Sequence, residues 1–195
     1  MSFQVLSRSG YARRGELTTK TCAVQTPVFM PVGTYGTVKG LTPEHLHDIG
    51  FEIILGNAFH LHQRPGLEII KKFKGLHNFM GWNKSILTDS GGFQIWSLNK
   101  LRKITEKGVE FKSPLDGSKI FMSPEDSINT QLNLNSDIVM AFDECTDYPS
   151  SYEDAKKSMQ LTHRWTERSV NYFQKNQKDH LLFGIVQGGM HEELR

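Results

Sequence analysis

Four short apolar runs recur along the chain, and each is followed directly by a polar side chain. Runs of this length are typical of strands that are buried on both faces of a sheet. They are residues 52–56 before Asn57, residues 85–88 before Asp89, residues 137–142 before Asp143 and residues 181–186 before Gln187. An earlier run over residues 28–32 predicts a fifth strand, although its Pro31 cannot donate a backbone hydrogen bond.

Signals that start helices lie between these runs. Thr42 and Ser123 each precede a proline, which is typical of an N-cap followed by the first helical position. Ser151 and Asp154 resemble a capping box at the start of the longest helical pattern. Strands that alternate with helices indicate βα units, whose strands are parallel.

A β-hairpin is expected in the segment after Asp89. Residues 109–112 and 119–122 are strand-like and flank Asp116-Gly117, a dipeptide that favours tight turns. We expect this hairpin to overhang the polar side chains at the strand ends.

Two architectures contain a buried parallel sheet, the doubly wound sheet and the (β/α)8 barrel. We favour the α/β barrel because polar groups follow strand after strand, as expected where several strand ends surround one pocket. The chain also has no dinucleotide-binding fingerprint and no Walker-type Gly-Lys-Ser/Thr motif. A typical barrel has about 250 residues. We therefore expect residues 1–195 to be the N-terminal portion of a single barrel domain in a longer polypeptide, with about five of the eight strands.

Composition excludes several classes of protein. With 23 Lys+Arg and 21 Asp+Glu the net charge is +2, which is neither an acidic tail nor a basic footprint. A hydrophobic content of 37% can fill a core, and no apolar run approaches the roughly 20 residues of a membrane-spanning helix. The first residues lack a secretory signal. The two cysteines, Cys22 and Cys145, cannot form a four-ligand zinc site without several histidines, and the eight histidines show no metal-finger spacing around them. We expect a cytoplasmic protein with no complete metal site in this chain.

The segment after the second predicted strand has the composition of a ligand site. Asp89 begins residues 89–93, Asp-Ser-Gly-Gly-Phe, where glycines permit close backbone approach and an aromatic ring can cover a flat ligand. Asn57, at the end of the preceding strand, is expected to donate a hydrogen bond that orients Asp89. The alternative is structural, since Asp89 can cap the following turn and Asn57 can bond to loop backbone.

The side chains after the last two predicted strands suit recognition of guanine. A carboxylate at Asp143 offers two acceptor oxygens that match the N1–H and N2–H₂ donors of the base. The amide of Gln187, which precedes two glycines, can donate to the purine O6. The alternative for either residue alone is a helix cap.

Five stretches of the chain together resemble one known family. They are residues 26–40, 54–61, 87–94, 136–145 and 183–189. The family is the bacterial tRNA-guanine transglycosylases, also called queuine tRNA-ribosyltransferases. The resemblance implies a (β/α)8 barrel and a pentosyltransferase that exchanges guanine at the tRNA wobble position for 7-aminomethyl-7-deazaguanine, in queuosine biosynthesis.

The resemblance also implies roles for individual residues. Asp89 matches the general acid/base, Asp143 and Gln187 match the base-reading pair, and Cys145 matches the bacterial form of the pocket, which favours the aminomethyl precursor. Phe93 stands where some members have tyrosine, which keeps the stacking face and loses a hydroxyl. The site residues that we expect are Asp89, Ser90, Gly91, Gly92, Phe93, Asp143, Gln187 and Gly188, supported by Asn57 and Cys145.

The partners implied by the resemblance are a tRNA anticodon loop, a guanine or 7-deazaguanine base and a second copy of the chain in a homodimer. The family also has a structural zinc. Its cysteine and histidine ligands, and the nucleophilic aspartate, lie in the family beyond the position of Arg195.

Two further hypotheses remain open. The chain could instead be a non-catalytic subunit or fragment that binds tRNA or a barrel partner. A metal-dependent hydrolase could use His60 and His62, which would share one side of a strand. We interpret the three tryptophans as packing residues, and the basic groups near residues 13–14, 71–74 and 100–103 as solvated faces or phosphate contacts.

Overall fold

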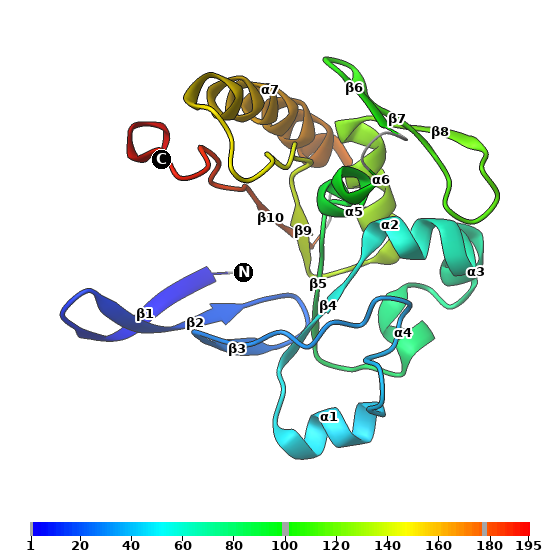
Figure 1. The fold of residues 1–195 in the computed structure, drawn as a ribbon. Helices are drawn as coiled ribbons and strands as arrows, with labels where there is room; N and C mark the ends of the chain where they lie inside the picture. Colours follow the sequence, from blue (N-terminus) through cyan, green and yellow to red (C-terminus); the bar gives the residue numbers. More distant parts are fainter. Residues whose placement is uncertain (1, 99–101, 177–178) are drawn as a thin grey trace. The chain divides into compact units, whose positions relative to one another are not determined.

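In a computed structural model, which describes residues 2–98, 102–176 and 179–195, the predicted apolar runs pair into a parallel sheet (Figure 1). Its strands are β4 (Ile53–Gly56), β5 (Ser85–Thr88), β9 (Ile138–Met140) and β10 (Leu181–Phe183), in the order β10-β9-β5-β4. Both β4 and β9 pair with β5 in parallel. The prediction of a parallel sheet is confirmed, and the strand order follows the chain without the reversal of a doubly wound sheet.

The predicted ends of β9 and β10 are wrong, since the predicted runs continue to residues 142 and 186. Ala141 still donates a backbone hydrogen bond to Phe183 O (2.9 Å), and Ala141 and Phe142 are fully buried. Their apolar character therefore reflects burial in a core rather than strand pairing. Val186 is 70% exposed and lies outside any strand.

The prediction of a strand over residues 28–32 is also wrong. Only Val32 pairs there, in a single parallel bridge with Leu55. Gly33 N donates to Leu55 O (2.6 Å) and Leu55 N donates to Pro31 O (2.9 Å). Pro31 accepts a backbone hydrogen bond but has no N–H group to donate one. The pairing with β4 therefore does not continue into the exposed residues before Pro31.

An antiparallel sheet at the N-terminus was not predicted. It consists of β1 (Ser2–Ser9), β2 (Ala12–Thr18) and β3 (Ala23–Thr26), with β2 in the middle. Most of its side chains are exposed and several are charged, so the sequence has no alternating apolar pattern there.

The predicted hairpin is present as β7 (Gly108–Lys112) and β8 (Lys119–Met122), in a register that pairs Val109 with Met122. A six-residue loop containing Asp116-Gly117 joins the two strands. A third strand, β6 (Arg102–Thr105), pairs with the other edge of β7 and was not predicted.

The predicted helix starts are confirmed. Thr42 caps α1 (Pro43–Ile49), which ends at Gly50, and Ser123 and Ser151 accept from backbone N–H groups at the starts of α6 (Pro124–Leu134) and α7 (Tyr152–Asn176). The remaining elements are α2 (Ala58–Leu61), η1 (His62–Gly66), α3 (Leu67–Lys72), α4 (Leu76–Met80), α5 (Gly92–Ser97) and η3 (Glu192–Leu194).

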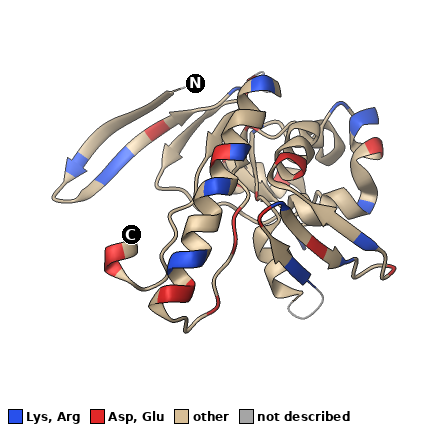
Figure 2. Ribbon diagram, turned by 90° about the horizontal axis from the view of Figure 1, so that it is seen from above, with Lys and Arg blue, Asp and Glu red and all other residues tan. Residues whose placement is uncertain are grey.

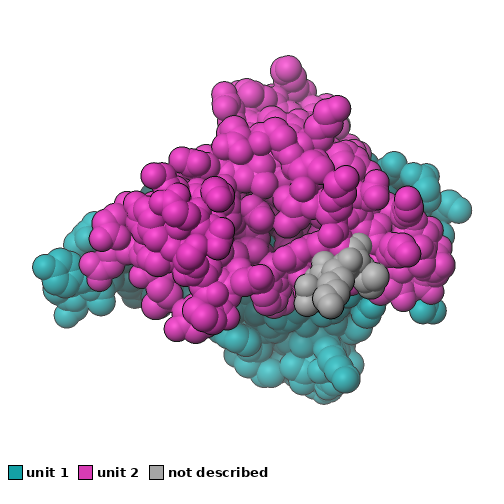
Figure 3. Space-filling view, turned by 45° about the horizontal axis from the view of Figure 1, so that its top comes forward, with its two compact units in different colours: residues 1–89, 130–139, 177–181 teal, residues 90–129, 140–176, 182–195 magenta. Residues whose placement is uncertain are grey.

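The chain forms two units, which are coloured separately in Figure 3. Unit 1 comprises residues 1–89, 130–139 and 177–181, and unit 2 comprises residues 90–129, 140–176 and 182–195. The core of unit 1 gathers apolar side chains from α1 to α4, β4, β5 and α6, with Trp82 donating to Ser85 O (3.0 Å). In unit 2, the rings of Phe142 and Trp165 stack with centroids 5.0 Å apart.

Charged residues of both signs are interspersed along the ribbon (Figure 2). On α7, Arg164 pairs with Glu106 and Arg168 pairs with Glu125, so part of the basic charge is neutralised by unit 2 itself. Of the basic groups considered above, Lys100 lies outside the described residues. Within the described ranges, no helix is both long and apolar enough to cross a membrane.

Candidate functional site

Asp89 is held at the end of β5 in unit 1. Its backbone N–H donates to Gly56 O (3.1 Å), which continues the parallel pairing of β5 with β4 by one residue. This register brings the two strand ends together, and Asn57 Nδ2 donates to Asp89 Oδ2 (2.5 Å). Ala58 N donates to Oδ1 (2.9 Å). Both carboxylate oxygens accept hydrogen bonds from the β4–α2 junction, so the carboxylate is held in one orientation.

His60 lies near this carboxylate and is not arranged as a metal ligand. It is in α2, whereas His62 is in η1, so the prediction that both share one side of a strand is wrong. The ring of His60 contacts those of Tyr35 and Phe59, with centroids 5.2 Å and 5.3 Å away. Burial lowers the pKa of His60, and the negative charge of Asp89 only partly opposes this. A neutral imidazole is therefore favoured beside Asp89.

Asp143 is the centre of a second group of predicted site residues, all in unit 2. Its side chain is buried, with 8% exposure. Ser90 Oγ donates to Oδ1 (2.9 Å), and Gln187 Nε2 donates to Oδ2 (3.0 Å). Cys145 Sγ lies 3.7 Å from Oδ2 as a further donor. Burial raises the pKa of Asp143, and the three donors limit this rise because they stabilise the charged form.

The two glycines after Ser90 allow this arrangement. Gly91 has φ of 87° at the N-cap of α5, a left-handed conformation that favours glycine. At Gly92 the reason is space, since a Cβ there would lie 2.5 Å from Asp143 Oδ1 and 2.6 Å from Asp143 O. The start of α5 lies so close to Asp143 that only a residue without a side chain fits at this position.

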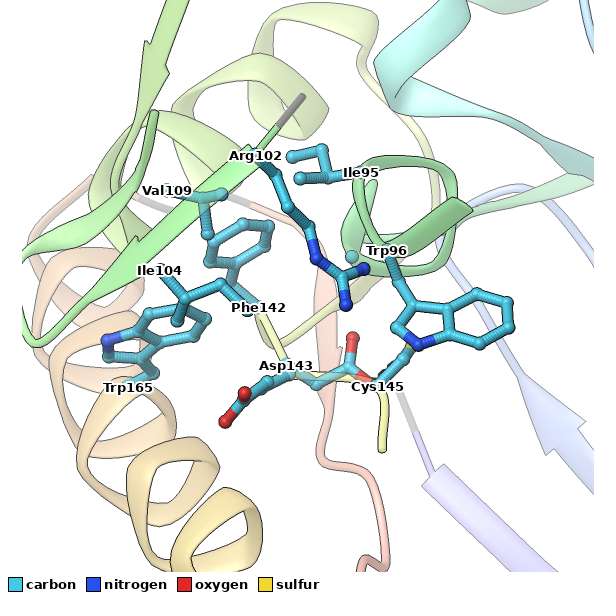
Figure 4. A pocket seen from close by; sticks show the side chains of 11 residues that line it. Ile95, Trp96, Arg102, Ile104, Val109, Phe142, Asp143, Cys145 and Trp165 are labelled. Atoms are coloured by element: carbon cyan, nitrogen blue, oxygen red, sulfur yellow. Dashed lines mark hydrogen bonds between the residues drawn. The ribbon is translucent and has the colours of Figure 1, made fainter. Parts of the chain in front are cut away.

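An open pocket lies in unit 2 beside the side chains of Asp143 and Gln187. Its walls include Asp143, Cys145, Gln187, Phe93 and Trp96. The ring of Phe93 is exposed, and its plane is tilted by 31° from that of Trp96. Beside it lies a smaller pocket, where Arg102 from β6 reaches toward Trp96 (Figure 4).

Gly188 does not belong to the lining of the open pocket, and its contact with a substrate stays a prediction. It is buried against Leu194, since a Cβ added to Gly188 would lie 2.8 Å from Leu194 Cβ, and Gly189 lines the open pocket instead. Asp89 and Asn57 belong to unit 1, so a single pocket shared by all four strand-end side chains stays a prediction.

Comparison with known proteins identifies the family. A family model described as queuine tRNA-ribosyltransferase matches residues 7–195. The chain is 60% identical over 195 residues to the queuine tRNA-ribosyltransferase of Dechloromonas aromatica (strain RCB), and 60% identical over 196 residues to that of Acinetobacter baumannii (strain ACICU). The chain belongs to the queuine tRNA-ribosyltransferase family. These matches cover 100% of the chain but 53% and 52% of the two relatives, so the chain spans about half their length.

Membership of the queuine tRNA-ribosyltransferase family implies a zinc ion. The described residues of this chain do not form a site that fits it. Among residues 2–98, 102–176 and 179–195, no group of three or more His, Cys, Asp or Glu side chains could hold a metal ion. Zinc therefore has no part in the steps proposed for these residues.

Trp96 and Arg102 contribute to the pockets, and neither contribution was predicted from the sequence. Trp96 was interpreted as a packing residue, yet it lines the open pocket. The signal that indicates its position is the three-residue spacing from Phe93, because such residues share one face of a helix. Arg102 comes from a strand that was not predicted.

Cys145 is expected to be an unreactive thiol. Burial, with the nearby charge of Asp143, raises its pKa to about 12. Because the thiolate is the reactive form, only about one Cys145 in ten thousand is ionised at pH 8, against roughly a quarter for a free cysteine with a pKa near 8.5. Alkylation by iodoacetamide, followed at this residue by mass spectrometry, should be about a thousandfold slower than that of a cysteine peptide. The rate should rise about tenfold per pH unit from pH 8 to 10; a plateau in that range would contradict the shift.

Proposed function

We propose that the full-length protein containing this chain is a tRNA-guanine transglycosylase. It exchanges guanine at the wobble position of tRNA for 7-aminomethyl-7-deazaguanine, in queuosine biosynthesis. The observation that carries the proposal is the buried Asp143 carboxylate, held by Ser90 and Gln187 at an open pocket with an exposed aromatic ring, in a chain of the queuine tRNA-ribosyltransferase family.

The geometry around Asp143 supports recognition of guanine rather than adenine. The Asp143 carboxylate accepts hydrogen bonds in the ligand-free chain, so it can accept them from the N1–H and N2–H₂ of guanine. Gln187 then releases Oδ2 and turns its amide donor toward O6. Adenine has an acceptor at N1 and a donor at its exocyclic nitrogen, and it would leave these groups mismatched. This edge is the same in guanine and 7-deazaguanine, which permits exchange.

The target base has to leave its stack in the anticodon loop to reach this pocket. Aromatic surface can replace part of the stacking that the base loses, and Phe93 presents such a surface at the pocket wall. The tRNA anticodon loop is the partner that this reaction requires, and a homodimer is the assembly that we propose for the full-length protein.

Asp89 is proposed as the general acid/base. In the exchange, a nucleophilic carboxylate from the remainder of the protein attacks ribose C1′ as the bond to guanine N9 breaks, and the departing base takes a proton. The incoming base then attacks C1′ from the vacated face, and the bond between C1′ and the nucleophilic carboxylate breaks. Asp89, which gave its proton to the departing base, takes the N9 proton of the incoming base. Two displacements retain the stereochemistry at C1′. The hydrogen bonds from Asn57 and Ala58 support the role, because they hold Asp89 in one orientation.

A (β/α)8 barrel is the architecture that we propose for the complete catalytic domain. Its support is the order of β4, β5, β9 and β10, which follows the chain, and the position of polar side chains after successive strands. The second half of the barrel would come from the part of the protein that the relatives have and this chain lacks.

Incorporation of radiolabelled guanine into unmodified tRNA by the full-length protein tests the proposed function. We expect label in the tRNA, chased out by excess 7-aminomethyl-7-deazaguanine. Saturable tRNA binding with no incorporation would contradict the proposal and favour the non-catalytic binding subunit.

A further inference from the structure

Trp96 is the one described tryptophan that lines the open pocket, and three contacts hold its indole ring. Its Nε1 donates to Asp147 Oδ1 (2.6 Å). The guanidinium carbon of Arg102 lies 6.0 Å from the ring centroid, within cation–π range. The ring of Phe93 lies 5.4 Å away, centroid to centroid. These contacts come from α5, β6 and the segment before α7, all within unit 2.

Phe93 needs such support if a base is to stack on it. Its side chain is 61% exposed, so solvent surrounds most of the ring. A ring that is free to reorient loses that freedom when a ligand stacks on it, and the loss weakens binding. A ring whose plane is already set by a neighbour does not incur this loss. Trp96, one helical turn along α5, is placed to set the plane of Phe93.

Trp96 also lines two neighbouring pockets. It lines the open pocket with Asp143 and Gln187, and it lines the smaller pocket beside Arg102 (Figure 4). Removing the indole would take away part of the lining of the open pocket and leave Phe93 without its aromatic neighbour.

We propose that Trp96 is a positioning residue of the base pocket, which acts by fixing the plane of Phe93, and that Asp147 and Arg102 fix Trp96 in turn. This inference rests on the proposed function, because it assigns the ligand of the pocket as a guanine-type base. Trp96 thereby controls affinity for the base rather than the chemical step.

Steady-state guanine exchange by the full-length protein tests the inference. In Trp96→Leu and Asp147→Ala, we expect the KM for guanine to rise about fivefold with kcat within about twofold, the size expected for one lost aromatic contact. We expect KM to stay within about twofold of the wild-type value in two conservative variants. Trp96→Phe keeps an aromatic ring, and Asp147→Asn keeps an acceptor oxygen. A purely structural role would lower kcat and the melting temperature and would leave KM unchanged.

Tyr152→Leu is the matched control. Tyr152 is partly exposed in the same unit, and its ring centroid lies 5.4 Å from that of His191. This distance equals the one between Phe93 and Trp96, so the variant removes a comparable ring contact outside both pockets. We expect its KM and kcat to match the wild type. An unchanged KM in both Trp96→Leu and Asp147→Ala, with normal exchange in the wild type, overturns the inference.

Tryptophan fluorescence separates this inference from the proposed function. Trp82 and Trp165 are 2% and 0% exposed, so a guanine in the open pocket should quench mainly Trp96. Quenching that is saturable in the wild type and lost in Trp96→Phe supports the place of Trp96 even where exchange fails. Exchange in the wild type without any quenching contradicts contact between this aromatic pair and the base.

Discussion

Asp89→Asn is expected to lower the kcat of base exchange by at least about a thousandfold, within the range for loss of a general acid/base. The amide cannot take up and return the N9 proton. The fold should be retained, because the new side chain can still accept from Ala58 N, and the Asn57 amide can turn to accept from the new Nδ2. Binding of tRNA should stay within about threefold of the wild type, since the change removes one proton-transfer group.

The matched control is Asp48→Asn, an exposed carboxylate on α1 in the same unit. It makes the same chemical change away from the strand ends and should leave exchange intact. Single-turnover exchange and tRNA binding measured in parallel separate the chemical step from affinity. Turnover of Asp89→Asn within about tenfold of the wild type would refute the acid/base role.

Gly92→Ala is expected to lower kcat/KM for guanine about a hundredfold, as a displacement of about 1 Å in a binding site can. The added Cβ would lie 2.5 Å from Asp143 Oδ1 and 2.6 Å from the backbone O of the same residue. The carboxylate can rotate away, but the backbone oxygen moves only with the chain. Either response alters the Ser90 and Gln187 hydrogen bonds that hold the acceptor oxygens. The effect should therefore appear mainly as a higher KM for the base.

Gly184→Ala controls for the loss of a glycine in the same unit. A Cβ at this position would meet no atom within 4 Å, and its φ lies outside the left-handed region. We expect exchange kinetics within about twofold of the wild type. Equal kinetics for Gly92→Ala and Gly184→Ala would show that the close approach of α5 to Asp143 has no part in base recognition.

The elements that were predicted correctly depend on local signals. The N-caps at Thr42, Ser123 and Ser151 need only a hydroxyl a few residues from the backbone groups that it caps. The hairpin of β7 and β8 is similarly local, since short strands and turn residues follow one another. The strand over residues 28–32 failed because an apolar run does not reveal whether a neighbouring strand is available to pair with it.

The candidate site was predicted as a set of residue types, and its interactions were only partly predictable. The hydrogen bond from Asn57 to Asp89 follows from adjacent parallel strands, once their register is known. Trp96 was misinterpreted because a tryptophan in a core and one at a pocket wall have the same local pattern. Its contacts with Asp147 and Arg102 involve segments that spacing does not connect.

The amino-acid sequence by itself determined the family, the parallel strands with their polar ends and the residue types that can read a guanine edge. These properties are local, because periodicity and hydrogen-bonding capacity belong to short segments. Only the tertiary structure decided that Asp143 is buried with donors from positions 53 and 44 residues away, and that glycine is required beside it. Burial and donor geometry arise only when segments that are distant in the chain meet in space. This burial and these donors set the pKa of Asp143 and keep Cys145 a protonated thiol.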